Sequence, residues 1–247
     1  MSAATLRWAV VFVVAAATGC GDPGSKAAPS TRRGDRVPVE STTRATAGAT
    51  TTAKPARDRT GAPRVLFLGT SLTAGQGLED PGTDAYPAVI QRLADSAMVP
   101  AFVVNAGLSG ESSAGALRRT DWLLREKPDV VVLETGANDG LRGLDPDSTA
   151  ANLRAIIAKV RAANPATRIL LVQMEAPTNL GGRYTRAFHA LFAKVAAEEH
   201  VTLLPFLLDG VAGIAKLNQP DGIHPTPEGA RIAAKNIWPG VEKALRR

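Results

Sequence analysis

The sequence predicts an α/β protein with three layers, in which helices cover both faces of a parallel five-stranded sheet. Short apolar segments of strand length alternate with longer segments whose apolar residues recur at helical spacing. The connections between successive strands are long enough for right-handed crossovers. The expected strand order is 2-1-3-4-5, the flavodoxin-like arrangement, which places a ligand crevice where the order reverses between strands 1 and 3.

Each element follows from a local pattern. We expect strands over residues 64–69, 101–105, 129–135, 168–174 and 201–204. The run Val130-Val131-Val132-Leu133 is typical of a strand that is buried on both faces. We expect helices over residues 86–99, 112–127, 147–164, 184–200, 207–217 and 227–245. Pro165 should end the third of these helices.

The N-terminal segment predicts export. Arg7 precedes an apolar run from Trp8 to Ala17. This run is too short to cross a bilayer, which needs about 20 residues, but it fits a signal peptide. It ends in Ala17-Thr18-Gly19-Cys20, which resembles a bacterial lipoprotein signal. Residues 1–20 are therefore interpreted as a lipoprotein signal peptide ending at Cys20, the only cysteine in the chain.

A lipid on Cys20 would anchor the protein to a membrane. Several acyl chains bind a membrane stably, whereas a single chain binds it only weakly and reversibly. The expected location is beyond the cytoplasmic membrane, facing the periplasm or the cell exterior. The alternative is a conventional signal peptide that is cut among the same small residues.

Residues 21–63 predict a disordered tether. They are rich in Ser, Thr, Ala, Pro, Gly and Arg and show neither helical nor strand periodicity. The tether holds eight Lys or Arg and four acidic residues, and Arg7 adds one more positive charge. Of the formal charge of +6, only +1 remains for residues 64–247, the predicted globular domain. This near-neutral domain gives no indication of nucleic-acid binding.

Cysteine and histidine counts limit the chemistry further. One cysteine excludes an intrachain disulfide. The three histidines, His189, His200 and His224, have no paired ligand spacing, so no metal site and no cofactor are expected.

Polar residues with catalytic potential follow the first three strands and precede the last helix. Ser71 follows the first strand, Gly107 lies in the loop after the second, and Asn138 follows the third. A serine hydroxyl needs an adjacent base, and His224 is the candidate. Asp221, three residues earlier, can orient the imidazole. A glycine N–H and a neutral amide can donate hydrogen bonds to a developing oxyanion.

Each residue also has a simpler explanation. Ser71 could cap a helix, Asn138-Asp139-Gly140 and Asp221-Gly222 are good turn sequences, and His224 could be structural. Their joint occurrence at the ends of the right strands, in order, favours function.

These motifs resemble the SGNH, or GDSL, hydrolase family. Its four blocks occur in order as Gly69-Thr70-Ser71-Leu72, the Gly107 block, Gly136-Ala137-Asn138-Asp139, and Asp221-Gly222-Ile223-His224-Pro225. The longer stretches around them are similar to the bacterial thioesterase I, lysophospholipase and arylesterase branch. The resemblance covers essentially all of residues 64–247. The chain departs at Thr70, where the family usually has aspartate.

The resemblance implies a serine esterase that acts on a small-molecule ester or lipid, and we expect it to be a monomer. Ser71 would be the nucleophile, His224 the base and Asp221 its partner. The Ser71 N–H, the Gly107 N–H and the Asn138 side chain would bind the oxyanion. The region after the fourth strand contacts the acyl chain in the resembling branch, so Asn179, Leu180 and Tyr184 are the expected substrate contacts.

Other functions remain open at this point. An α/β-hydrolase would have Gly-x-Ser-x-Gly, but residue 73 is Thr. A non-catalytic ligand-binding lipoprotein on the same fold would be expected to lack part of the catalytic set. A flavin protein would need a phosphate cradle after the first strand. A carbohydrate O-acetyl esterase of the same family is a further alternative.

Overall fold

The computed structural model describes residues 61–247, so the predicted signal peptide, Cys20 and residues 21–60 of the predicted tether lie outside the described residues. The sheet consists of β1 (Arg64–Gly69), β2 (Phe102–Gly107), β3 (Val130–Leu133), β4 (Arg168–Gln173) and β5 (Thr202–Phe206). All paired strands are parallel, and the order is β2-β1-β3-β4-β5. The predicted fold class and strand order are confirmed.

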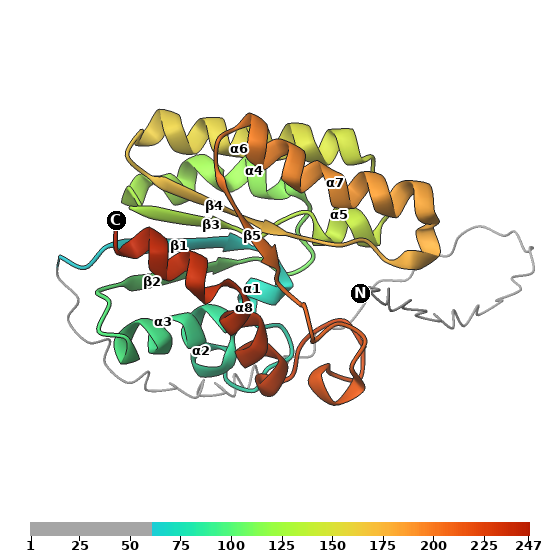
Figure 1. The fold of residues 1–247 in the computed structure, drawn as a ribbon, viewed down its shortest axis with the longest axis horizontal. Helices are drawn as coiled ribbons and strands as arrows, with labels where there is room; N and C mark the ends of the chain where they lie inside the picture. The colour runs from blue at the N-terminus through green and yellow to red at the C-terminus, as the bar shows by residue number, and fades with distance from the viewer. Residues whose placement is uncertain (1–60) are drawn as a thin grey trace, which may run out of the picture. The chain divides into compact units, whose positions relative to one another are not determined.

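Helices cover both faces of this sheet. The elements are α1 (Ser71–Ala74), α2 (Pro81–Asp84), α3 (Tyr86–Ser96), α4 (Ser113–Leu123), α5 (Ala137–Leu141), α6 (Pro146–Ala163), α7 (Gly182–Glu198) and α8 (Pro227–Leu245). Single 3₁₀ turns lie at Leu124–Glu126, Thr178–Leu180 and Ala215–Leu217. Helices α4, α6 and α7 pack on one face, and α3 and α8 pack on the other (Figure 1).

Local sequence sets the helix ends. Asp145 caps α6, because its carboxylate accepts hydrogen bonds from the N–H groups of Asp147 and Ser148. Thr226 caps α8 in the same manner, and Pro227 occupies the first helical position, where no N–H is needed. The core lies between the sheet and these helices, and the side chains of β3 are fully buried.

The predicted helix over residues 207–217 is wrong. This stretch forms a series of turns and one 3₁₀ turn, Ala215–Leu217. Gly210 and Gly213 adopt left-handed φ values of 69° and 76°, which a continuous α-helix does not allow. The short helices α1, α2 and α5 have no counterpart in the prediction, because four or five residues are too few for helical periodicity to show.

The register aligns the carboxyl ends of the central strands. Gly69 of β1 pairs with Gly107 of β2, and Leu68 pairs with Leu133 of β3. The loops that follow these strands therefore start side by side, at the switch point that the strand order predicts.

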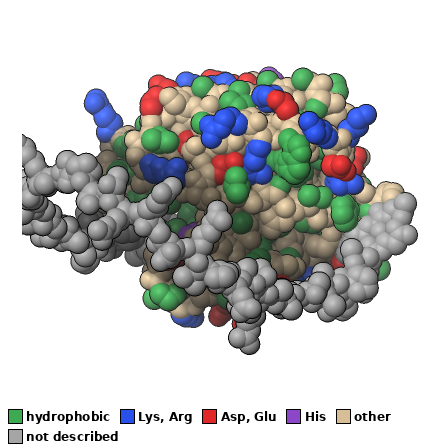
Figure 2. All heavy atoms as spheres, turned by 180° about the vertical axis from the view of Figure 1, so that it is seen from behind, with side chains coloured by type: hydrophobic (Ala, Val, Ile, Leu, Met, Phe, Trp, Pro, Cys, Tyr) green, Lys and Arg blue, Asp and Glu red, His purple; other side chains and the backbone are tan. Residues whose placement is uncertain are grey.

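On the face shown in Figure 2, basic and acidic side chains are interspersed. Among residues 61–247, no helix is long and apolar enough to cross a membrane.

Candidate active site

A chain of hydrogen bonds links Ser71, His224 and Asp221. The Oγ of Ser71 lies 2.8 Å from Nε2 of His224. The other ring nitrogen, Nδ1, lies 2.6 Å from Oδ2 of Asp221. Ser71 is only 9% exposed, so its hydroxyl is shielded but still borders the crevice. The structure thus brings together three residues that the sequence predicted, from opposite ends of the domain.

Asp221 is held as an anion. Partial burial opposes its ionisation, but hydrogen bonds from the backbone N–H and imidazole of His224 and from the N–H of Ile223 outweigh it, so the pKa of Asp221 lies below its ordinary value. The carboxylate therefore stays charged at weakly acidic pH, where it can stabilise an imidazolium.

Gln219 ties the histidine loop to the serine helix. Its amide donates to the backbone oxygen of Gln76, just beyond α1, at 2.8 Å, and to that of Pro225 at 2.9 Å. The Gln219 N–H also donates to the backbone oxygen of His224 at 2.7 Å. Gly77 makes room for this amide, because a Cβ there would lie 2.0 Å from the Gln219 oxygen.

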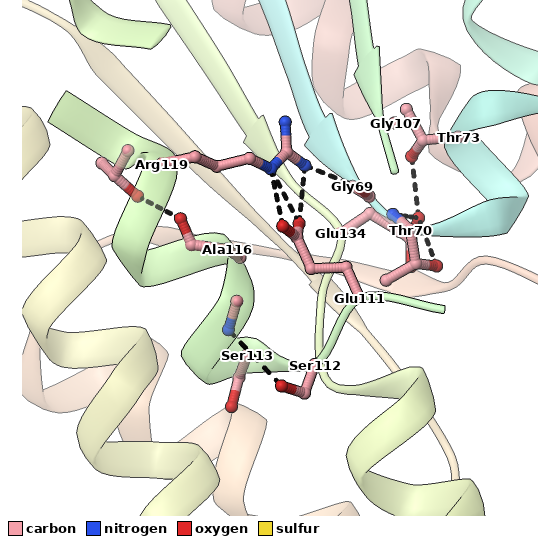
Figure 3. Close-up of polar contacts among 12 residues, drawn as sticks. Gly69, Thr70, Thr73, Gly107, Glu111, Ser112, Ser113, Ala116, Arg119 and Glu134 are labelled. Carbon is pink, nitrogen blue, oxygen red and sulfur yellow. Dashed lines mark hydrogen bonds and ion pairs between the residues drawn. The ribbon is translucent and has the colours of Figure 1, made fainter. Parts of the chain in front are cut away.

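A buried carboxylate binds the turn that carries Ser71. Glu134 follows β3, and its side chain is fully buried. It accepts hydrogen bonds from the N–H and hydroxyl of Thr70 and from the hydroxyl of Thr73, at 2.7–3.2 Å (Figure 3). Burial raises the pKa of Glu134, and these hydrogen bonds oppose the rise. Ser71 lies between the two threonines, so this one carboxyl group fixes both sides of the nucleophile.

Thr70, where the family usually has aspartate, supplies two of these donors, its N–H and its hydroxyl. An aspartate there would place a second carboxyl group against Glu134, and two carboxylates at such a distance do not both ionise readily. Threonine donates instead. Gly69 is also required, because a Cβ at this position would lie 1.9 Å from the Thr73 hydroxyl and 2.7 Å from Glu134.

Gly107 ends β2, and Asn138 lies in α5 just after β3; these two strands flank β1, which leads to Ser71. A Cβ on Gly107 would lie 2.1 Å from the backbone nitrogen of Ala74, so only glycine allows β2 to approach α1 this closely. The Gly107 N–H donates to Oδ1 of Asn105 at 2.9 Å. The Asn138 amide donates one hydrogen bond, to the backbone oxygen of Glu111 at 3.0 Å, which leaves its second N–H for another acceptor.

The residue after Asn138 fixes the adjoining loop. The buried carboxylate of Asp139 accepts hydrogen bonds from the N–H and hydroxyl of Ser113, at 2.8 and 2.5 Å, and from the hydroxyl of Thr149 at 3.3 Å. The loop after β3 is therefore bound to the start of α4 at two adjacent residues.

The sequence and the fold are similar to those of known proteins. A model of the GDSL-like lipase/acylhydrolase family matches residues 67–232. The chain belongs to this family. Esterase TesA of Pseudomonas aeruginosa is 40% identical over 186 residues, which cover 74% of this chain and 90% of that protein. Thioesterase 1/protease 1/lysophospholipase L1 of Escherichia coli strain K12 is 41% identical over 185 residues, which cover 73% and 86%.

The fold comparison agrees. A crystal structure of TesA superposes with a TM-score of 0.69 at 37% sequence identity, covering 73% of this chain and 99% of that structure. The chain is a GDSL-type hydrolase with the α/β/α fold of its relatives.

An apolar cavity of about 260 Å³ opens beside the Ser71–His224 pair of this hydrolase. Most of its lining residues are apolar. They include Leu141 at the end of α5, Met174 after β4, Phe206 and Leu208 at and after the end of β5, and Ile223 in the histidine loop. Such a lining suits a hydrocarbon chain better than a sugar.

The predicted substrate contacts lie outside this lining. Leu180 is partly exposed in the 3₁₀ turn after β4, next to Asn179. The Tyr184 hydroxyl donates to the backbone oxygen of Leu144 at 2.8 Å, so it supports the loop after α5. Their roles in substrate binding stay predictions.

Sequence reasoning missed Glu134, Gln219 and the ion pair of Glu111 with Arg119. Only Glu134 gave a local signal. It directly follows the continuous apolar run Val130–Leu133, and a carboxylate next to such a buried segment is unusual unless it has hydrogen-bond partners. The hydrogen bond of Gln219 with Gln76 joins residues that are 143 positions apart, and no pattern near Gln219 reveals it. Among residues 61–247, no group of three or more potential ligands could hold a metal ion.

Proposed function

We propose that Ser71 is the nucleophile of an esterase that works through an acyl-Ser71 intermediate. The hydrogen-bonded chain from Ser71 through His224 to Asp221 carries this proposal. His224 takes the hydroxyl proton while Ser71 Oγ attacks the ester carbonyl, and it then gives the proton to the leaving alcohol or thiol. Water, activated by the same imidazole, releases the acid. All of these residues come from one chain, which is compatible with activity as a monomer.

The oxyanion would be bound by the Ser71 N–H, the Gly107 N–H and the second N–H of Asn138. In the structure, Asn105 accepts from Gly107. A developing oxyanion is a stronger acceptor than this neutral amide oxygen, so it would replace Asn105 during the reaction.

The substrates we propose are carboxylic esters or thioesters with an apolar acyl chain, including lysophospholipids. The apolar cavity beside Ser71 supports this choice, as do the names of the relatives, an esterase and a thioesterase/lysophospholipase. A carbohydrate O-acetyl esterase would need polar groups for the sugar, and the cavity offers few.

The experiment is a panel of p-nitrophenyl esters from acetyl to palmitoyl, with an acetylated sugar as the comparison. We expect kcat/KM to rise from acetyl to medium chain length and the sugar ester to be a poor substrate. A preference for the acetylated sugar would favour the O-acetyl esterase instead. An absence of hydrolysis across the panel would favour a ligand-binding protein.

Asn138→Ala should lower kcat by about 10²–10³, the usual loss when one oxyanion donor is removed. KM should change little, because the oxyanion forms only in the transition state. Steady-state kinetics with the best ester of the panel measure both constants. A rise in KM with unchanged kcat would assign Asn138 to substrate binding.

We further propose that the hydrolase is a lipoprotein anchored through Cys20 outside the cytoplasmic membrane. The lipoprotein-like sequence that ends at the only cysteine supports this proposal. Cys20→Ser should move the protein from the detergent phase to the aqueous phase in phase partitioning. Equal partitioning of both forms into the aqueous phase would indicate a conventional signal peptide.

A further inference from the structure

Arg119 and Glu111 form a shielded ion pair next to the candidate oxyanion site. Arg119 lies on α4, and Glu111 lies in the loop between β2 and α4. The guanidinium Nε and Nη2 contact the carboxylate at 2.6–2.9 Å (Figure 3). The side chain of Arg119 is 20% exposed and that of Glu111 is 5% exposed. Gly115 makes room for the pair, because a Cβ there would lie 2.7 Å from Cγ of Glu111.

This ion pair contacts both halves of the candidate site. Arg119 Nη2 also donates to the backbone oxygen of Gly69 at 3.1 Å, two residues before Ser71. On the other side, the backbone oxygen of Glu111 accepts the hydrogen bond from the Asn138 amide. One connected set of polar contacts therefore runs from the end of the nucleophile strand to Asn138.

Stability alone is a weak reason for such a pair. Removing two charges from water costs free energy that their attraction often only balances, and well-packed apolar side chains would serve α4 as well. A bidentate arginine–carboxylate contact does, however, fix geometry. The residue that it fixes here, Glu111, is also the one whose backbone oxygen accepts the hydrogen bond from the Asn138 amide.

We propose that Arg119 and Glu111 are positioning residues that hold the Asn138 amide at its distance from Ser71. This inference rests on the proposed oxyanion role of Asn138. Neither side chain touches the substrate. Without the pair, the loop that carries the Glu111 carbonyl shifts relative to Gly69, and Asn138 loses its fixed orientation toward the developing charge.

The first test is the split between kcat and KM in Arg119→Met. A misplacement of about 1 Å can cost about 10²-fold in rate, so we expect kcat to fall about 10- to 100-fold with KM changed less than about twofold. Glu111→Gln should show the same pattern, since its backbone carbonyl remains but its charge is lost. Arg119→Lys should recover part of the loss, because it restores the charge without the bidentate geometry.

The matched control is Arg118→Met. Arg118 is the neighbouring residue on α4 and is exposed, so this variant makes the same change in charge without touching the pair. It should retain the wild-type kcat. Equal losses in Arg118→Met and Arg119→Met would overturn the proposal.

The decisive test is a double-mutant cycle with Asn138→Ala. If Arg119 acts through Asn138, Arg119→Met should lower kcat less than about twofold once Asn138 is alanine. Multiplied losses would show that Arg119 acts elsewhere, and the positioning proposal alone would fail. An unchanged kcat in Asn138→Ala itself would instead refute the oxyanion role, and the inference with it. If Arg119→Met does not fold, the cycle is run with Arg119→Lys. A loss that disappears in the Asn138→Ala background again supports the proposal, and multiplied losses again refute it.

Discussion

Ser71→Ala is expected to lower kcat by about 10⁴–10⁶, because members of a serine triad act as a unit and loss of the nucleophile removes the covalent route. The fold should persist. The only hydrogen bond of the Ser71 hydroxyl among the described residues joins it to His224 at the crevice, so its loss leaves no buried group in the core without a partner. The measurements are kcat with the best ester of the panel and the midpoint of thermal unfolding.

A suitable control is Ser96→Ala, which removes an exposed hydroxyl on α3. It should retain wild-type activity. Mass spectrometry after reaction with a phosphonate ester should find the label on Ser71 in the wild type and no label in Ser71→Ala. Substantial turnover by Ser71→Ala, or a label on another residue, would refute the nucleophile assignment.

Asp221→Asn should lower kcat by about 10⁴, as the imidazole loses the acceptor that orients it and sets its tautomer. The variant should also change the pH dependence. In the wild type, the pKa of Asp221 lies below its ordinary value, so the carboxylate stays charged through the acid limb. A change in the carboxylate's own charge therefore does not set that limb, and a rate that depends on a neutral base falls when the base is protonated.

Removing the negative charge makes the imidazolium less favoured, so the acid limb of Asp221→Asn should move to lower pH. Profiles of kcat/KM against pH for both forms measure the shift. The control is Asp147→Asn, which neutralises an exposed carboxylate in the first turn of α6 and should leave the limb in place. An acid limb at the same pH in wild type and Asp221→Asn would contradict the pairing of His224 with Asp221.

The sheet and the triad were predictable for different reasons. The five strands are short apolar runs between helical segments, and this alternation is visible in the sequence without knowledge of any tertiary contact. Ser71 and Asn138 were singled out because they follow strands directly, and Asp221 and His224 because they form a short motif before the last helix that resembles the GDSL family. Their catalytic roles stay predictions. The same reasoning failed at residues 207–217, where apolar spacing indicated a helix but the left-handed Gly210 and Gly213 produce turns.

The supporting residues could not be predicted, since their environment exists only in the folded chain. Glu134 becomes an acceptor for Thr70 and Thr73 only because β3 lies next to β1. Arg119 and Arg118 are adjacent and identical in sequence terms, yet one is shielded against Glu111 and the other is exposed. Side-chain burial distinguishes them, and burial is a property of packing.

The contact of Thr70 with Glu134 has a consequence for how such enzymes diverge. With threonine at this position, the turn below the nucleophile holds a single carboxyl group and has no like charge beside it. With aspartate, two carboxyl groups would share protons, and the number bound would change with pH. A substitution at this one position therefore alters the proton content of the turn without changing any residue of the triad. Evolution can in this manner adjust the pH range of an enzyme separately from its chemistry.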